Sequence, residues 1–281
     1  MANQDYHPPV NGLLNYGEGA ATSKQWPNYV QKLGLQETHI PELIRMATDE
    51  ALDQADSESL EVWAPTHAWR ALGQLKAKAA ATPLLALLDN VYDDWAHQEI
   101  PTVLSLIGPE VIPDIHRYLA DPKRDHYGRI TAVTCLRRLQ EYHPQARERC
   151  IDILLKQLAL FEENEPDLNG FLIAGLCDLE AVKHASEIEH AFAAKRVDLS
   201  IMGDWDEAQV QLGLKTRQEV PLRGFTPTKA LGPLSPEVLA LLSKELDPLT
   251  AFGPSKQRPQ PQGFGTSIKQ TKDKKTKKKR R

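Results

Sequence analysis

The sequence predicts an all-α fold in which helical hairpins stack into an α-solenoid. A pattern of one small or branched residue followed by leucine recurs in the 281-residue chain, at Ala71-Leu72-x-x-Leu75, Val103-Leu104-x-x-Ile107, Cys135-Leu136-x-x-Leu139 and Gly175-Leu176-x-x-Leu179. The leucines at the second position are 32, 32 and 40 residues apart. A period of this size indicates repeated two-helix units, each of which buries its apolar side only against its neighbours.

Helix starts recur along the chain as well. A proline that fixes the entry of a helix precedes apolar-periodic runs at Gly108-Pro109, His143-Pro144, Glu165-Pro166 and Ser235-Pro236. At Thr82-Pro83 we expect the threonine to cap a helix and the proline to take the first helical position, where its missing N–H is not needed. Pro101 and Pro113 fall inside or near the start of helical patterns, which predicts a kink or a later helix start.

These signals divide the chain into five parts. We expect helix pairs at 66–75 with 83–89, 95–107 with 109–120, 128–142 with 145–161, and 167–180 with 183–196. The predicted parts are an irregular N-terminal arm (1–37), the solenoid (38–200), a capping helix (201–217), a loop with a short helix at 236–246 (218–252) and a disordered basic tail (253–281).

The N-terminal arm is expected to lie across the first hairpin as extended chain. Pro8-Pro9 and Asn11-Gly12 interrupt regular structure, whereas Leu13, Trp26 and Tyr29 would be exposed to water in a frayed terminus. A helix is then expected to start at Thr38 or His39 and to run to about Ala55.

The charge is divided unevenly along the chain. Nine Lys/Arg and one acid, Asp273, follow from Lys269 onward, so this tail carries +8; since the whole chain carries −4, residues 1–268 carry −12. The candidate binding residues of the tail are Lys272, Lys274, Lys275, Lys277, Lys278, Lys279, Arg280 and Arg281. They could contact the phosphates of RNA, DNA or a ribosome. No aromatic residue among them could stack on bases, and a solvated tail or one that folds back on the acidic body is the alternative.

Cysteine usage and the N-terminus favour a cytoplasmic protein. The three cysteines show no C-x-x-C spacing, and Cys135 and Cys177 are expected to fill small core positions, as in a reducing compartment. The first residues lack the basic and apolar regions of a signal peptide, and no apolar run approaches about 20 residues, so we expect no membrane partner.

Several stretches resemble a family of bacterial HEAT-like repeat proteins related to the phycobilisome-lyase HEAT repeats. They are residues 39–49 (HIPELIRMATD), 62–75 (VWAPTHAWRALGQL), 169–172 (NGFL) and 203–209 (GDWDEAQ). The resemblance spans most of residues 8–215 and implies the α-solenoid fold, but no catalytic motif. Some relatives end in a cysteine-rich SEC-C motif that binds zinc, whereas Phe264 to Arg281 contain no cysteine, which excludes thiolate zinc binding there.

A second group of candidate binding residues is Trp63, His67, Trp69 and Arg70. His67, Arg70 and Gln74 share helical spacing opposite the apolar stripe, which predicts a polar face. Such a face could hold an anionic ligand or a partner peptide, and an ordinary solvated face is the alternative.

The acidic motifs and the remaining residue patterns point to no reaction and no cofactor. Asp93-Asp94-Trp95 and Asp204-Trp205-Asp206-Glu207 could attract a cation, but an aspartate before a helix is an ordinary cap and tryptophan an ordinary packing residue. The histidines and cysteines show no metal-ligand spacing, and the chain contains no nucleophile elbow, P-loop or dinucleotide fingerprint.

Three functional hypotheses follow. The first is a non-enzymatic scaffold for an unknown protein partner, which uses the solenoid face and the basic tail. The second is a factor that associates with nucleic acid or ribosomes through the tail. The third, a bilin-lyase-like protein that handles a chromophore, rests on the family resemblance alone.

Overall fold

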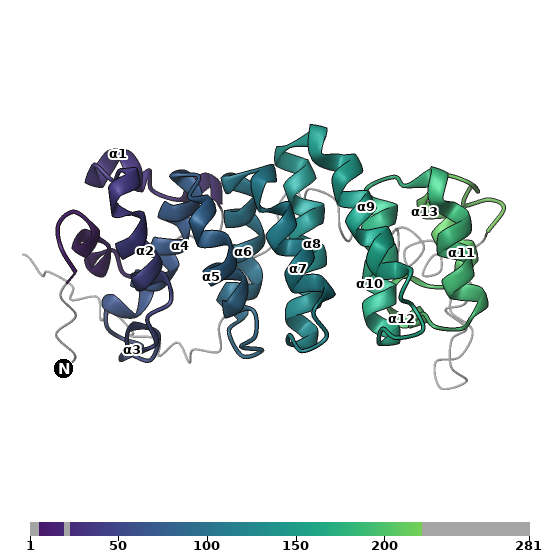
Figure 1. Ribbon diagram of the computed structural model, residues 1–281, viewed down its shortest axis with the longest axis horizontal. Coiled ribbons are helices and arrows are strands. Elements are labelled where there is room, and N and C mark those ends of the chain that lie inside the picture. Colours follow the sequence, from purple (N-terminus) through teal and green to yellow (C-terminus); the bar gives the residue numbers. More distant parts are fainter. Residues whose placement is uncertain (1–5, 20–22, 221–281) are drawn as a thin grey trace, which may run out of the picture. The chain divides into compact units, whose positions relative to one another are not determined.

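The predicted all-α class is confirmed. The computed structural model describes residues 6–19 and 23–220, apart from the side chain of Lys24, and all regular structure in these ranges is helical (Figure 1). These residues lie within one compact unit, Met1–Leu222. The predicted short helix at 236–246 and the Lys/Arg tail lie outside the described ranges.

The helices lie close to the ranges predicted for them. The α-helices are α1 (Tyr29–Leu33), α2 (Ile40–Ala47), α3 (Glu50–Asp53), α4 (Ala64–Gln74), α5 (Ala81–Leu87), α6 (Asp94–Ile107), α7 (Ile112–Ala120), α8 (His126–Tyr142), α9 (Arg147–Leu158), α10 (Pro166–Asp178), α11 (Ala185–Ala193), α12 (Leu199–Met202) and α13 (Trp205–Gln211). Helix α6 contains Pro101, and α7 starts later than predicted, with Pro113 in its first turn.

Short 3-10 turns precede many of the helices. In the arm these are η1 (Val10–Asn15) and η2 (Ser23–Gln25), so the arm is not simply extended chain. Turns η3 (Glu37–His39) and η4 (Glu61–Trp63) precede α2 and α4. Turns η5 (Lys78–Ala80), η6 (Pro109–Val111), η7 (Pro144–Ala146) and η8 (Val182–His184) lead directly into α5, α7, α9 and α11.

Two details of the sequence prediction are wrong. Thr82 does not cap a helix, because η5 leads into α5 at Ala81, and the Thr82 hydroxyl instead donates to Asp114 Oδ1 over 3.3 Å. The helix predicted from Thr38 to about Ala55 is interrupted after Ala47. There the Asp49 side chain accepts a hydrogen bond from the Ala51 N–H at 3.0 Å, which starts α3 as a new helix.

The helices contact one another in two rows. Helices α2, α4, α6, α8 and α10 contact in succession and form the first row, and α5, α7, α9 and α11 do the same in the second. The second-row helices α5, α7 and α9 also contact the first-row helix that follows them, namely α6, α8 and α10. These helices therefore pack against near neighbours along the chain.

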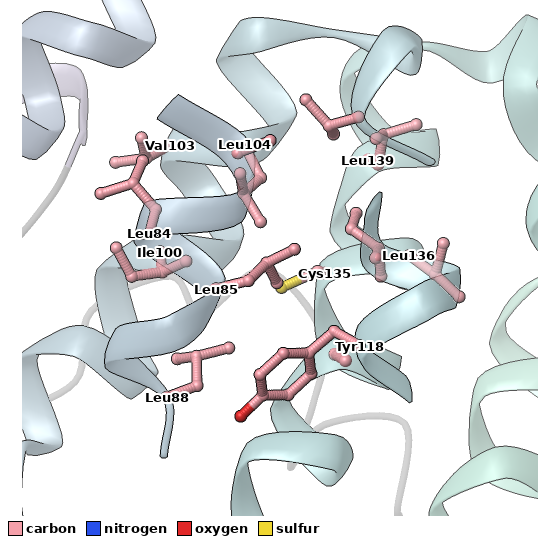
Figure 2. Packing of buried hydrophobic residues seen from close by; sticks show 14 of the residues in the cluster. Leu84, Leu85, Leu88, Ile100, Val103, Leu104, Tyr118, Cys135, Leu136 and Leu139 are labelled. Atoms are coloured by element: carbon pink, nitrogen blue, oxygen red, sulfur yellow. The ribbon is translucent and has the colours of Figure 1, made fainter. Parts of the chain in front are cut away.

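The core lies between the two rows (Figure 2). Leu84 and Leu85 of α5 face Ile100, Val103 and Leu104 of α6, and the group continues through Tyr118 of α7 to the residues of α8, Cys135, Leu136 and Leu139. The four recurring leucines, Leu72, Leu104, Leu136 and Leu176, are all fully buried. Burying one such side chain is worth about 1.5–3 kcal/mol, so the repeated pattern coincides with the main source of stability.

The first turn of α8 lies very close to the end of α5, and the absence of a side chain at Gly128 permits this approach. A Cβ placed there would lie 2.6 Å from the carbonyl oxygen of Leu88 and 2.2 Å from the Tyr118 hydroxyl oxygen. At Gly175 in α10 the nearest atoms are side-chain carbons of Leu154 and Val133, both at 3.1 Å. The backbone of Leu88 cannot move aside for a Cβ at position 128, whereas the flexible side chains of Leu154 and Val133 can move aside for one at position 175.

We therefore expect Gly128→Ala to lower the free energy of unfolding by about 3 kcal/mol, the upper end for overpacking, and Gly175→Ala to lower it by no more than about 1 kcal/mol. Urea denaturation of both variants measures the difference. Equal losses would contradict the close approach of α8 to the end of α5.

Candidate functional site

The N-terminal arm packs across the first helices. Turn η1 and helix α1 both contact α4, and Tyr6, Val10, Leu13 and Tyr29 are buried. Gln74 of α4 binds the arm from both ends of its amide: Oε1 accepts from the Tyr29 N–H at 2.9 Å, and Nε2 donates to the Pro27 carbonyl at 2.8 Å. The arm thus covers the first helices, as its apolar residues predicted.

His67 of α4 hydrogen-bonds two residues of the arm. Its Nε2 lies 2.7 Å from the Gly17 carbonyl oxygen, which can only accept, so Nε2 carries the proton. Neutral His67 then accepts at Nδ1 from the Tyr29 hydroxyl, 2.7 Å away. Burial lowers the pKa of His67, and the nearby positive charge of Arg70 lowers it further. Neutral histidine is therefore the form that fits this network.

Arg70 and Glu99 form a buried ion pair between α4 and α6. The guanidinium donates from Nε to Glu99 Oε2 at 2.7 Å and from Nη2 to Glu99 Oε1. The two side chains are 1% and 5% exposed. Burial by itself would lower the pKa of Arg70, but its hydrogen bond and ion pair with Glu99 raise it overall. The Cζ of Arg70 lies 4.9 Å from the centre of the Trp26 ring.

The predicted polar face is therefore not a solvent-facing surface. His67, Trp69 and Arg70 are buried, and Gln74 is half-buried beneath the arm. The helical spacing assigned these residues to the correct face, but the spacing carries no information about a covering segment that lies some 40–50 residues earlier. The prediction of a solvated face was wrong for this reason.

The two candidate tryptophans have different surroundings. Trp69 donates from Nε1 to the Ala47 carbonyl at 2.7 Å and connects α4 to the end of α2. Trp63 is half-buried and packs edge-on against Trp95, with ring centres 5.2 Å apart. Of the four predicted binding residues on this segment, Trp63 alone is partly exposed.

A cleft of about 400 Å³ opens beside this network, between the arm and helices α6 and α8. Its walls include Trp26 of the arm, Trp95, His97, Gln98 and Glu99 of α6, and Arg138 of α8. Three segments that are far apart in sequence meet here. Sequence reasoning identified Trp95 only as a packing residue beside a cap and Trp26 only as an apolar residue of the arm, and it gave no signal for Arg138.

The polar groups of the cleft are held in place by neighbouring side chains. Arg138 donates from Nη1 to Thr102 Oγ1 at 2.8 Å, and His97 Nδ1 lies 2.7 Å from Thr131 Oγ1. Gln98 is exposed at the rim. The cleft therefore combines two indole rings with a guanidinium, an imidazole and an amide on ordered helices. These groups can bind a polar chain and pack against apolar side chains.

The other residues that the sequence analysis considered cap helices or lie in the core. The side chains of Asp93 and Asp204 accept hydrogen bonds from the N–H groups of Ala96 and Glu207, so both cap helices as expected. Cys135 and Cys177 lie in the core, and burial raises the pKa of each thiol to about 12. Throughout residues 6–19 and 23–220, each helix is too short or too polar to span a bilayer.

Comparison with protein-family models, curated proteins and solved structures gives no match for this chain.

Arg70→Met should lower the free energy of unfolding by about 3–5 kcal/mol, because Glu99 is left buried without its cation. The double variant Arg70→Met/Glu99→Leu should recover most of that loss, since both charges are then replaced by apolar groups. Urea denaturation of both variants measures this. A double variant as unstable as Arg70→Met would show that the ion pair is not the cause.

Acidification should weaken the fold through His67. Its pKa is lowered in the folded chain, so the unfolded chain binds the proton more tightly, and stability is lost as pH falls below the ordinary value of 6.5. We expect the unfolding free energy of His67→Gln to depend less on pH between about 7 and 5 than that of the unaltered chain. Denaturation series at several pH values give the two slopes, and identical slopes would contradict the assignment.

Proposed function

We propose that this chain is an α-solenoid of HEAT-like hairpins that acts as a non-enzymatic scaffold and binds a segment of a partner protein. The two rows of helices that contact in succession support the solenoid. Partner binding is supported by one observation above all, the cleft between the arm and helices α6 and α8. Three buried free thiols fit a reducing cytoplasmic location.

The cleft favours an extended peptide with an acidic group. Its volume of about 400 Å³ lies in the usual range of ligand sites, about 300–1,000 Å³. Arg138 offers a guanidinium for a carboxylate, and the Trp26 and Trp95 rings offer an apolar surface. The exposed Gln98 amide can donate to and accept from a peptide backbone. A segment with an acidic side chain and an apolar residue nearby can pair with Arg138, pack against the two indole rings and hydrogen-bond to Gln98 through its backbone.

The basic tail, Lys272 to Arg281, adds a second, electrostatic contact in this proposal. Two linked contacts bind more tightly than either alone, because the second occurs at a high effective concentration. Deletion of the tail should therefore weaken partner binding most at low ionic strength.

The cleft is tested with a photo-crosslinking residue in place of Gln98, and with the same residue in place of Glu189, which is exposed on α11 and serves as control. After crosslinking in an extract of the source cells, peptide mapping identifies the captured segment. We expect capture at position 98 of a segment that contains an acidic and an apolar residue, and no capture of that segment at position 189.

The synthetic segment is then titrated against Trp95→Ala and Arg138→Gln. Each variant should weaken binding by about tenfold or more, since each removes a central contact. Glu189→Ala should leave the affinity unchanged, and circular dichroism confirms that the variants are folded. If both cleft variants bind as the unaltered chain does, the cleft is not the binding site.

A further inference from the structure

A second surface, apart from the cleft, lies along one edge of the two rows. Because successive helices reverse direction, the loops that enter the first-row helices share an edge, and in Figure 1 α3 and the loops after α5 and α7 lie along the lower side. We define the acidic edge as residues 54–60, 88–93, 121–125 and 159–165. The loops between first-row and second-row helices, residues 75–80, 108–111, 143–146 and 179–184, form the opposite edge.

Charge differs sharply between the two edges. The acidic edge has two bases, Lys123 and Arg124, and nine acids, Asp56, Glu58, Asp89, Asp93, Asp121, Asp125, Glu162, Glu163 and Glu165. The opposite edge has three lysines, Lys76, Lys78 and Lys183, and two acids, Glu110 and Glu180. Burial, followed by the charges of Asp93 and Glu50, raises the pKa of Asp53 at the end of α3. The carboxylates of Asp53 and Asp93 are thus close enough to repel one another.

Local structure accounts for some of these acids but not for all. Asp93 and Asp125 cap α6 and α8 through the Ala96 and Gly128 N–H groups. In contrast, Glu58, Glu162 and Glu163 are exposed and cap no helix. These three carboxylates are therefore available to a cationic partner.

Exposed apolar side chains gather along the same edge. Leu60, Val91, Tyr92, Tyr127 and Leu160, each in one of the four loops or in the first turn of the helix that follows, are 55%, 38%, 92%, 60% and 42% exposed. On the opposite edge the corresponding large residues are Tyr142 and Val182, both 40% exposed. At 92% exposure the ring of Tyr92 contributes almost nothing to the core, and packing gives no reason for it. Apolar groups in successive loops, surrounded by acids, are typical of a surface that contacts a partner.

The dimensions suit an extended chain. Packed helices lie about 8–10 Å apart, so a segment of about ten residues at ~3.4 Å per residue crosses the loops of four successive first-row helices. Arginine suits the edge best among the side chains, because its guanidinium pairs with carboxylates and also stacks on tyrosine rings. A nucleic acid backbone would be repelled by the same carboxylates.

We propose that the acidic edge docks an extended, arginine- and lysine-rich segment of a partner protein, with Tyr92 and Tyr127 as stacking contacts and Glu162 and Glu163 among the paired charges. This contact is independent of the cleft and favours the opposite charge. It would let one chain hold two different segments.

The test is a fluorescence anisotropy titration of the full chain with a labelled peptide of alternating arginine and serine, about twelve residues long, at about 50 mM salt. Two edge variants are compared, Tyr92→Ser/Tyr127→Ser and Glu162→Lys/Glu163→Lys. Their matched controls on the opposite edge are Tyr142→Ser and Glu110→Lys/Glu180→Lys. We expect about a tenfold loss of affinity or more in each edge variant and less than about a twofold change in each control.

Three outcomes would overturn the proposal. Equal losses in the edge and control variants would show attraction to net charge alone. Weaker binding of a labelled single-stranded oligonucleotide in the edge variants would show that this surface takes nucleic acid. Much tighter peptide binding by a chain without residues 269–281 would show that the chain's own Lys/Arg run, and not a partner, is the occupant. Urea denaturation of each variant confirms that it folds.

Discussion

The buried contact between Arg70 and Glu99 connects the parts of the molecule on which the candidate site depends. It joins α4 to α6 in the first row, and the same guanidinium packs against the Trp26 ring of the arm. Glu99 is also a wall residue of the cleft. One desolvated pair therefore sets the spacing of two helices and the position of the segment that closes one side of the binding cleft.

Such a pair fixes geometry more than it adds stability. Two charges removed from water lose hydration that their mutual attraction only partly restores, so a well-packed apolar pair of similar size would be about as stable. An apolar pair, however, would leave the Trp26 ring without the cation that packs against it. In this arrangement Arg70 acts as a positioning residue for the arm, and the sequence pattern alone suggested a solvent-exposed role for it.

How far the sequence could predict this structure depended on the distance over which each signal acts. Recurring leucines, prolines at helix starts and capping aspartates are local, and they located the helices from α4 to α11 and the caps at Asp93 and Asp204. The break at Asp49 was missed because a side-chain hydrogen bond competed with a favourable helical pattern. The cleft was missed because Trp26, Trp95 and Arg138 come from segments that only tertiary packing brings together.

The hydrogen bonds of the arm join residues far apart in the chain. The bonds from His67 to Tyr29 and Gly17 and from Gln74 to Pro27 close loops of 38, 50 and 47 residues, and the bonds of His143 with Ser105 and of His126 with Asp167 span a similar 38 and 41. Trp26 of the arm is also a wall residue of the cleft, so opening of the arm would remove one side of the cleft. Ligand occupancy of the cleft and closure of the arm would therefore be thermodynamically coupled, so that each favours the other.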